Sequence, residues 1–94
     1  MQYDKYELLA RKHLALSCTT RIKIIMYWFK NGVTNVSNTA INMGLTQSMI
    51  SHHSGILQKS GIIGKKRNGP SVDCFIKDVE LVKFIANILG EDVE

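Results

Sequence analysis

The chain has 94 residues, and we expect them to form a single domain over residues 1–94. Hydrophobic residues make up 45% and charged residues 21% of the chain, proportions that exclude a disordered protein. It has no apolar run of about 18 residues and no apolar stretch near its N-terminus, so we expect neither a membrane span nor a secretory signal, and we expect a cytoplasmic protein.

Charge is distributed unevenly along the sequence. The formal net charge is +4, yet Asp4 and Glu7 are the only acidic residues before Asp73. Between Glu7 and Asp73 lie nine basic residues, namely Arg11, Lys12, Arg21, Lys23, Lys30, Lys59, Lys65, Lys66 and Arg67. This excess of positive charge favours a polyanionic partner. Nucleic acid is the first candidate, because neutralising its phosphates releases counterions and so drives binding. Anionic membrane is a weaker candidate, because no segment has a basic face opposite a bulky apolar face.

Helical periodicity starts close to the N-terminus. A first helix is expected over about residues 3–16, with Leu9, His13 and Leu16 on one stripe. Ser17 is expected to cap a second helix over residues 18–31, which ends at Gly32. Because apolar residues surround most of this second helix, we expect it to be the central helix of the core.

The middle of the chain has the spacing of a helix-turn-helix. We expect an extended segment at 33–35, a third helix at 37–43 capped by Ser37, and a fourth helix at 47–60 capped by Thr46. A turn of about three residues that contains Gly44 separates the third and fourth helices, which is typical of this motif.

A hairpin and a last helix are expected in the remainder. Residues 62–66 and 72–77 read as strands, and Asn68-Gly69 favours a hairpin, although Pro70 predicts a loop longer than two residues. Asp78 is expected to cap a helix over 79–89. The predicted fold class is therefore mainly α with a small β-hairpin, a winged helix-turn-helix.

The fourth helix carries the first group of candidate DNA-binding residues. If Ile50, His53 and Leu57 face inward, the outward face consists of small polar residues and His52, namely Gln47, Ser48, Ser51, His52 and Gly55. Gln pairs with adenine, and Ser bonds several base edges or phosphates, so this face suits the major groove. A plain solvated face is the alternative.

The hairpin carries the second group. Lys65, Lys66 and Arg67 precede the Asn68-Gly69 tip, where a wing would reach phosphate or the minor groove. Lysines that protect a sheet edge are the alternative explanation.

Three segments resemble the ArsR-type winged-helix repressors. LSCTTRIKII at 16–25 resembles their L-x-x-x-x-R-x-x-I-L opening, MGLTQSMISHH at 43–53 resembles their recognition segment LGLSQSTVSHH, and SGII at 60–63 resembles the AGLV before their wing. The resemblance covers about residues 14–77. It implies operator DNA as partner, repression, commonly an inducer, and a homodimer formed by the terminal helices at about 3–16 and 79–89.

The sequence departs from this family at several positions. Ser54 and Gly55 replace a Leu and a polar helix former, and Thr39 stands where Leu is common. The metal-binding patterns of the family are missing: the third helix has no Cys-x-Cys, and Asp78-Val79-Glu80 has Glu where a His ligand would be. We therefore expect no metal and no cofactor.

Cysteines and histidines have mainly structural explanations. Cys18 and Cys74 lack the spacing of a zinc site, so we expect two small buried thiols, while a redox pair stays open. We expect His53 to pack inward with a local hydrogen bond, His52 to meet phosphate or solvent, and His13 to lie at the interface.

Two classes of function remain. The chain has no Gly-rich phosphate loop, no nucleophile–His–acid order and no paired carboxylates in its body, so we expect no enzyme. The leading interpretation is a dimeric transcriptional regulator that binds double-stranded DNA, and the alternative is a winged helix that serves protein contact or architecture within a transcription or replication assembly.

Overall fold

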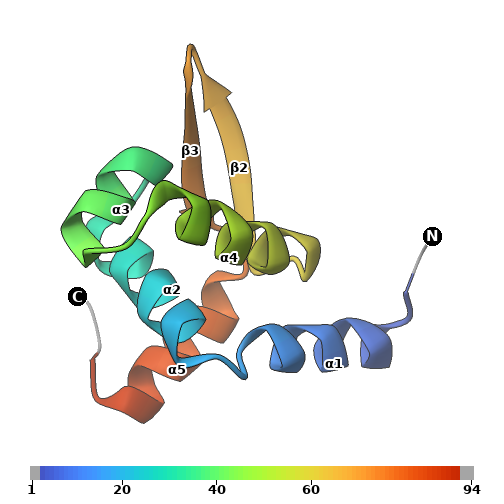
Figure 1. Cartoon of the computed structure of the whole chain (residues 1–94). Coiled ribbons are helices and arrows are strands. Elements are labelled where there is room, and N and C mark those ends of the chain that lie inside the picture. The colour runs from blue at the N-terminus through green and yellow to red at the C-terminus, as the bar shows by residue number, and fades with distance from the viewer. Residues whose placement is uncertain (1–2, 92–94) are drawn as a thin grey trace.

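The fold combines five helices with a three-stranded antiparallel sheet (Figure 1). A computed structural model describes residues 3–91. The elements in chain order are α1 (Lys5–Ala15), α2 (Thr19–Asn31), β1 (Thr34–Asn35), α3 (Val36–Met43), α4 (Gln47–Lys59), β2 (Ile63–Asn68), β3 (Ser71–Ile76) and α5 (Val79–Leu89). This order confirms the expected winged helix-turn-helix.

Helix α2 is the centre of the core, as its apolar circumference predicts. Ile24, Ile25 and Trp28 are fully buried, and α2 packs against β3, α4 and α5. The Trp28 indole Nε1 donates a 2.8 Å hydrogen bond to Oγ1 of the fully buried Thr39 in α3. A leucine at position 39 would leave the indole N–H without an acceptor, which explains the threonine.

Several helix ends are capped by the expected residues. The Thr46 side chain accepts a hydrogen bond from the Met49 N–H, and the Asp78 side chain accepts one from the Leu81 N–H. Helix α2 ends at Gly32, and α3 ends at Gly44, which adopts the left-handed conformation with φ +69°. These four predictions are confirmed, because each cap depends only on residues within one turn.

Two predicted caps are wrong. Ser17 Oγ donates to the Leu14 carbonyl and so completes the end of α1, which leaves Cys18 as the N-cap of α2 without a side-chain hydrogen bond. Helix α3 begins at Val36, not after Ser37, because the Asn35 side chain accepts from the Asn38 N–H at 2.7 Å. Asn35 therefore ends β1 and caps α3.

The first helix is also shorter than expected, beginning at Lys5. Asp4 and Glu7 form a capping box, in which each side chain accepts a hydrogen bond from the backbone N–H of the other residue. On the expected stripe, Leu9 and His13 are exposed, and the His13 Nδ1 lies 2.9 Å from the Leu9 carbonyl oxygen.

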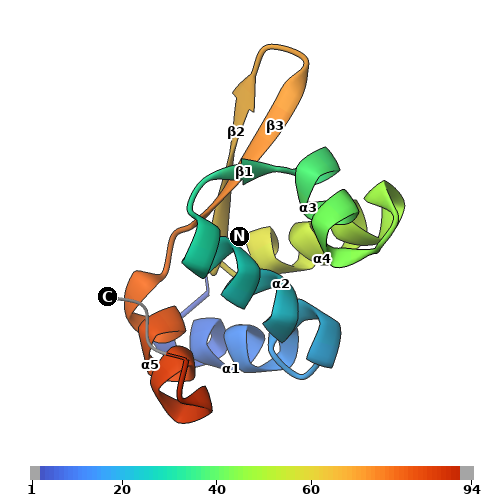
Figure 2. The ribbon, with the colours of Figure 1, turned by 90° about the vertical axis from the view of Figure 1, so that its left-hand side faces the viewer.

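The sheet has the strand order β1-β3-β2, and β2 and β3 form the wing (Figures 1 and 2). Asn68 pairs with Ser71, so the loop contains only Gly69 and Pro70. The prediction of a longer loop is wrong. Gly69 has φ +62°, which suits the first position of a tight type II′ turn, and the fixed negative φ of proline suits the second.

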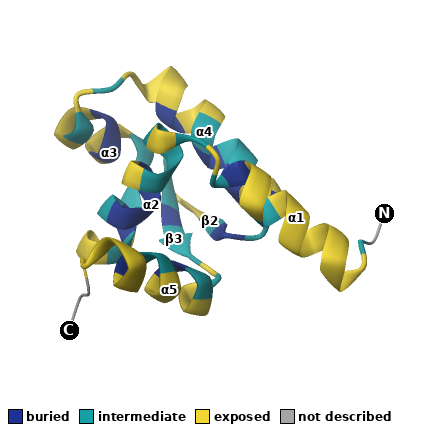
Figure 3. Cartoon of the chain, turned by 90° about the horizontal axis from the view of Figure 1, so that it is seen from below, coloured by how far each residue is buried: buried dark blue, intermediate teal, exposed yellow. Residues whose placement is uncertain are grey.

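The elements form two opposite faces. Helices α3 and α4 and the wing lie on one side of α2, while α1 and α5 lie on the other (Figure 1). Helix α1 projects from the body, with Ala15 as its one buried residue, and most of its surface is exposed (Figure 3). Within residues 3–91, no helix is long and apolar enough to cross a bilayer.

Candidate nucleic-acid interface

One face of α4 anchors this helix in the core. Ile50, Ser54 and Leu57 are completely buried, at the spacing of one helical stripe. Ser54 is accommodated because its hydroxyl donates a 3.0 Å hydrogen bond to the Ser51 carbonyl. The small hydroxyl side chain thus replaces the family's leucine without an unsatisfied polar atom.

The opposite face of α4 presents the candidate base-reading residues. Gln47, Ser48, Ser51 and His52 are all exposed, as the helical spacing predicts, and Gly55 is half-buried. Gln47 and Ser48 lie in the first turn, where backbone N–H groups lack helical partners and the helix dipole favours anions. This face therefore offers hydrogen-bond donors and acceptors with no carboxylate among them.

His53 lies behind this face and is half-buried, as expected, but its partner is not local. Its Nδ1 lies 3.2 Å from Nη1 of Arg21 in α2. Burial lowers the pKa of His53, and the charge of Arg21 and the neighbouring His52 lower it further. Because arginine only donates, the neutral imidazole accepts this hydrogen bond.

The wing tip and the start of α4 meet at a shared groove. This polar groove has a volume of about 230 Å³, and Gln47 and Ser51 line it from α4. The other lining residues come from the start of α3 and the hairpin, namely Asn35, Val36, Ser37, Pro70, Ser71 and Val72. Sequence reasoning missed Asn35, Ser37 and Ser71, whose only sequence signal is a polar side chain in a loop or at a helix start.

The three basic residues of the wing do not share one face. Successive strand residues alternate between faces, so Lys66 points away from Lys65 and Arg67. Arg67 pairs with Val72, which lines the groove beside α4, while Lys66 pairs with Asp73 on the other face. Asp73 also accepts a 3.2 Å hydrogen bond from the Asn68 side chain. Arg67 and Lys65 therefore lie on the same side of the wing as α4.

Some of the basic residues that predict a polyanionic partner form ion pairs or hydrogen bonds within the protein. Lys12 forms an ion pair with Asp78, and Lys30 forms one with Glu91. Arg21 donates to the Ala15 carbonyl at 2.6 Å as well as contacting His53. Acidic residues beyond position 73 thus neutralise two of the nine bases, while the three basic residues of the wing form no ion pair within residues 3–91.

The two cysteines lie far apart. Cys18 precedes α2, and Cys74 pairs with Thr34 just beyond the other end of α2, a helix about 20 Å long. A disulfide requires Cα atoms within about 7 Å, so the fold does not bring these thiols together. Cys74 is fully buried, and burial raises its pKa, whereas Cys18 is half-buried. Within residues 3–91, no three His, Cys, Asp or Glu side chains cluster as metal ligands.

Comparisons with known proteins agree with this arrangement. No family model matches the chain. The HTH-type transcriptional regulator MJ1325 of Methanocaldococcus jannaschii is 32% identical over 88 residues, which cover 94% of this chain and 98% of the relative.

Two solved structures share the fold over nearly the whole chain. The homodimeric winged helix-turn-helix DNA-binding domain of Mb0332 from Mycobacterium bovis, a possible ArsR-family regulator, superposes with a TM-score of 0.83 at 21% identity, covering 100% of this chain and 93% of that one. The transcriptional repressor PagR of Bacillus anthracis superposes with a TM-score of 0.79 at 23% identity, covering 94% and 99%. The chain therefore belongs to the HTH-type transcriptional regulators and has the winged-helix fold of the ArsR family.

Proposed function

We propose that this protein is a cytoplasmic, homodimeric repressor that binds double-stranded operator DNA in a sequence-specific manner. One observation carries the proposal: the exposed polar face of α4 and the tip of the wing line the same groove. This geometry suits a recognition helix in the major groove with a wing on the adjacent backbone.

The residues divide into two roles. Gln47, Ser48, Ser51 and His52 contact base edges or nearby phosphates, because they are exposed and lie in the first two turns of α4. Lys65, Lys66 and Arg67 contact the backbone, and the groove residue Ser71 adds a neutral donor at the tip. A dimer would read a pseudo-palindromic site with half-sites about one helical turn apart.

The face away from the wing supports a dimer. Large apolar side chains of α1 and α5 are exposed there, among them Tyr6 at 72%, Leu14 at 71%, Phe84 at 61% and Ile88 at 67%. Between α1 and the start of α5 lies a mainly apolar groove of about 520 Å³, lined in part by Leu8, Leu9 and Leu81. These faces suit the terminal helices of a second copy, and Mb0332 is itself homodimeric.

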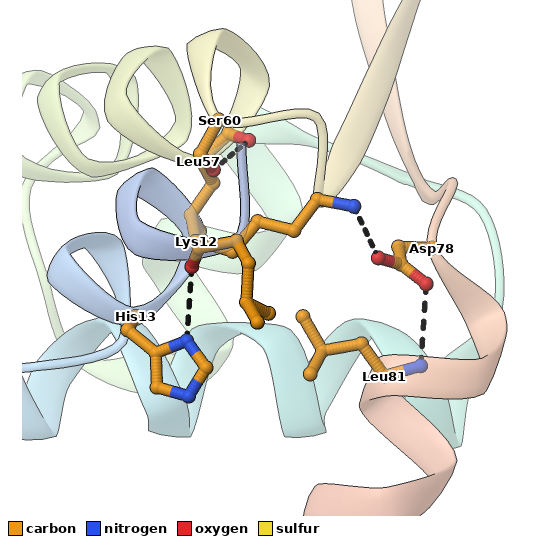
Figure 4. Close-up of polar contacts among 7 residues, drawn as sticks. Lys12, His13, Leu57, Ser60, Asp78 and Leu81 are labelled. Carbon is orange, nitrogen blue, oxygen red and sulfur yellow. Dashed lines mark hydrogen bonds and ion pairs between the residues drawn. The ribbon is translucent and has the colours of Figure 1, made fainter. Parts of the chain in front are cut away.

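An ion pair links the two terminal helices. The Lys12 ammonium lies 2.5 Å from Oδ2 of Asp78, whose Oδ1 caps α5 at the Leu81 N–H (Figure 4). Burial raises the pKa of Asp78, but the hydrogen bonds from Lys12 and Leu81 outweigh it and lower the pKa overall. Asp78 is therefore a carboxylate at neutral pH and connects the start of α5 to α1.

Fluorescence anisotropy tests the DNA-binding part of the proposal. Duplex from upstream of the protein's own gene is compared with a scrambled duplex over a salt series. We expect tight, preferential binding to the upstream duplex that weakens steeply as salt rises. Gln47→Ala should lower the preference by about 1–3 kcal/mol while leaving the affinity for scrambled DNA unchanged. Equal weak binding to both duplexes would contradict the proposal and favour a protein-contact role.

Light scattering after size-exclusion chromatography tests the dimer. The protein should elute as a dimer, and Phe84→Glu should shift it toward monomer, because a charge in an apolar interface is costly to desolvate. Lys83→Glu is the matched control, since Lys83 is an exposed neighbour on the same helix. A monomer at tens of micromolar protein would contradict the dimer.

A further inference from the structure

A third groove, separate from the groove beside α4 and from the groove between α1 and the start of α5, runs along α2 and reaches the end of α5. Its volume is about 550 Å³, within the range of about 300–1,000 Å³ typical of small-molecule sites. The apolar part of its lining comes from three helices, namely Ile22 and Met26 of α2, Met43 of α3 and Leu89 of α5. These side chains would hold the apolar body of a ligand.

Positive charge borders this apolar surface. Lys23 and Lys30 line the groove from α2, two helical turns apart and therefore on the same side of the helix. A carboxylate already binds one of them, because Glu91, just after α5, forms an ion pair with Lys30. Lys23 has no ion-pair partner within residues 3–91. The groove thus contains one lysine that is paired with an internal carboxylate and a second lysine, Lys23, without such a pair in the described residues.

The groove adjoins the helix-turn-helix. Met43 is the last residue of α3, directly before the Gly44 turn. Tyr27 of α2 also lines the groove, and its hydroxyl accepts a 2.8 Å hydrogen bond from Asn42 of α3. A ligand that displaces Tyr27 or Met43 would therefore change how α3 packs on α2.

We propose that this groove binds a small amphipathic carboxylate, whose anionic head engages Lys23 and Lys30 and whose apolar body lies on Met26 and Met43. The ligand head competes with the Glu91 carboxylate for Lys30. Binding shifts α3 and with it the recognition helix, so the ligand changes DNA affinity; this second step rests on the proposed DNA-binding function.

Charge complementarity favours this occupant over a helix of a second copy. The most exposed apolar side chains of α1 and α5, such as Tyr6, Leu14, Phe84 and Ile88, do not line the groove. A partner helix that filled the groove would place its own apolar side chains beside Lys23, whereas a carboxylate head would pair with this lysine.

Octanoate serves as the probe, with octan-1-ol and octylammonium as matched compounds of the same chain length. Binding to the full chain without DNA is followed by isothermal titration calorimetry and by NMR of the Met26 and Met43 methyl groups. We expect octanoate to bind and shift both methyl signals, and octylammonium to do neither. Lys23→Gln combined with Lys30→Gln should weaken octanoate at least about tenfold. Glu91→Gln should strengthen it, because the internal competitor is removed.

Lys83→Gln, which changes an exposed lysine of α5 outside the groove, is the control and should leave octanoate binding unchanged. Equal binding of all three probes, or absence of methyl shifts with octanoate, would overturn the site. Methyl shifts that depend on protein concentration alone would also overturn it and assign the groove to a second copy. Octanoate binding with unchanged affinity for the upstream duplex would overturn the coupling to DNA. Since the titration contains no DNA, its result is separate from the outcome of the DNA-binding test.

Discussion

Nη1 of Arg21 in α2 lies 3.2 Å from Nδ1 of His53 in α4, while Nε of the same guanidinium donates to the Ala15 carbonyl at the end of α1 at 2.6 Å. One side chain of α2 therefore links this central helix to α4 and to the end of α1. Because this link requires the neutral imidazole as acceptor, protonation of His53 removes it.

Stability should therefore fall below neutral pH. Burial and Arg21 lower the pKa of His53 below its ordinary value of 6.5. The contribution of His53 to the free energy of unfolding is complete above pH 6.5 and is lost as pH falls through the folded-state pKa, because the unfolded chain takes up the proton first. Urea unfolding at several pH values between about 5 and 7.5 measures this decrease.

His53→Gln should reduce the pH dependence of stability, since glutamine accepts from Arg21 but does not titrate. His13→Gln is the matched control, because His13 is an exposed histidine of α1 whose ring lies against the Leu9 carbonyl. Identical pH slopes for the wild-type protein and His53→Gln would contradict this prediction.

The Trp28–Thr39 hydrogen bond should be important for stability. Thr39→Val keeps the volume of the side chain but removes the acceptor of the buried indole N–H, and we expect it to lower the free energy of unfolding by about 1–3 kcal/mol. Thr39→Ser keeps the hydroxyl and should cost less than Thr39→Val. Chemical denaturation followed by Trp28 fluorescence measures both variants, and the reverse order would show that the hydroxyl is unimportant.

Replacement of Gly55 and of Gly64 by alanine should change the stability of the protein in opposite directions. A Cβ at Gly55 in α4 meets nothing within 4 Å, so Gly55→Ala should stabilise the protein by about 0.5–1 kcal/mol. A Cβ at Gly64 would overlap the Phe75 ring, which covers this glycine across the hairpin, so Gly64→Ala should destabilise by about 1–3 kcal/mol.

A double-mutant cycle isolates the cause at Gly64. Phe75→Leu removes the ring, so adding Gly64→Ala to Phe75→Leu should cost less than Gly64→Ala alone. Thermal unfolding gives the differences, and additive effects would exclude the ring contact as the cause.

The two faces of the wing should differ in DNA binding. Arg67 lies on the face that includes Val72 and the groove beside α4, whereas Lys66 lies opposite Asp73. Lys66→Gln should weaken binding to all duplexes alike, and Arg67→Gln should weaken it more, because Asp73 already offsets part of the Lys66 charge. Removing one cation that binds a phosphate should reduce the salt slope by about 1. Fluorescence anisotropy over a salt series compares the variants. A larger decrease in affinity for Lys66→Gln than for Arg67→Gln would contradict the prediction that the Arg67 face of the wing contacts DNA.

Local interactions explain which predictions from the sequence were confirmed. Thr46, Asp78, Gly32 and Gly44 act on backbone groups within one helical turn, so the residue type alone predicts the helix end. The exposed face of α4 follows from the 3.6-residue period in the same way. The caps predicted at Ser17 and Ser37 are wrong for a local reason as well. The Ser17 hydroxyl donates to the Leu14 carbonyl instead, and the Asn35 side chain caps α3 in place of Ser37.

Segments distant in the sequence determined the rest. The Arg21–His53, Trp28–Thr39, Lys12–Asp78 and Lys30–Glu91 contacts join different elements, and no spacing rule predicts which residues meet. Charge shows the difference clearly: the sequence by itself determined that residues 8–72 carry nine bases without an acid, and it predicted the order of helices and strands. Only the tertiary structure decided that Asp78 and Glu91 neutralise two of those bases and that Arg67, and not Lys66, lies on the face beside α4. Both depend on how the last helix and the hairpin pack against the helices before them.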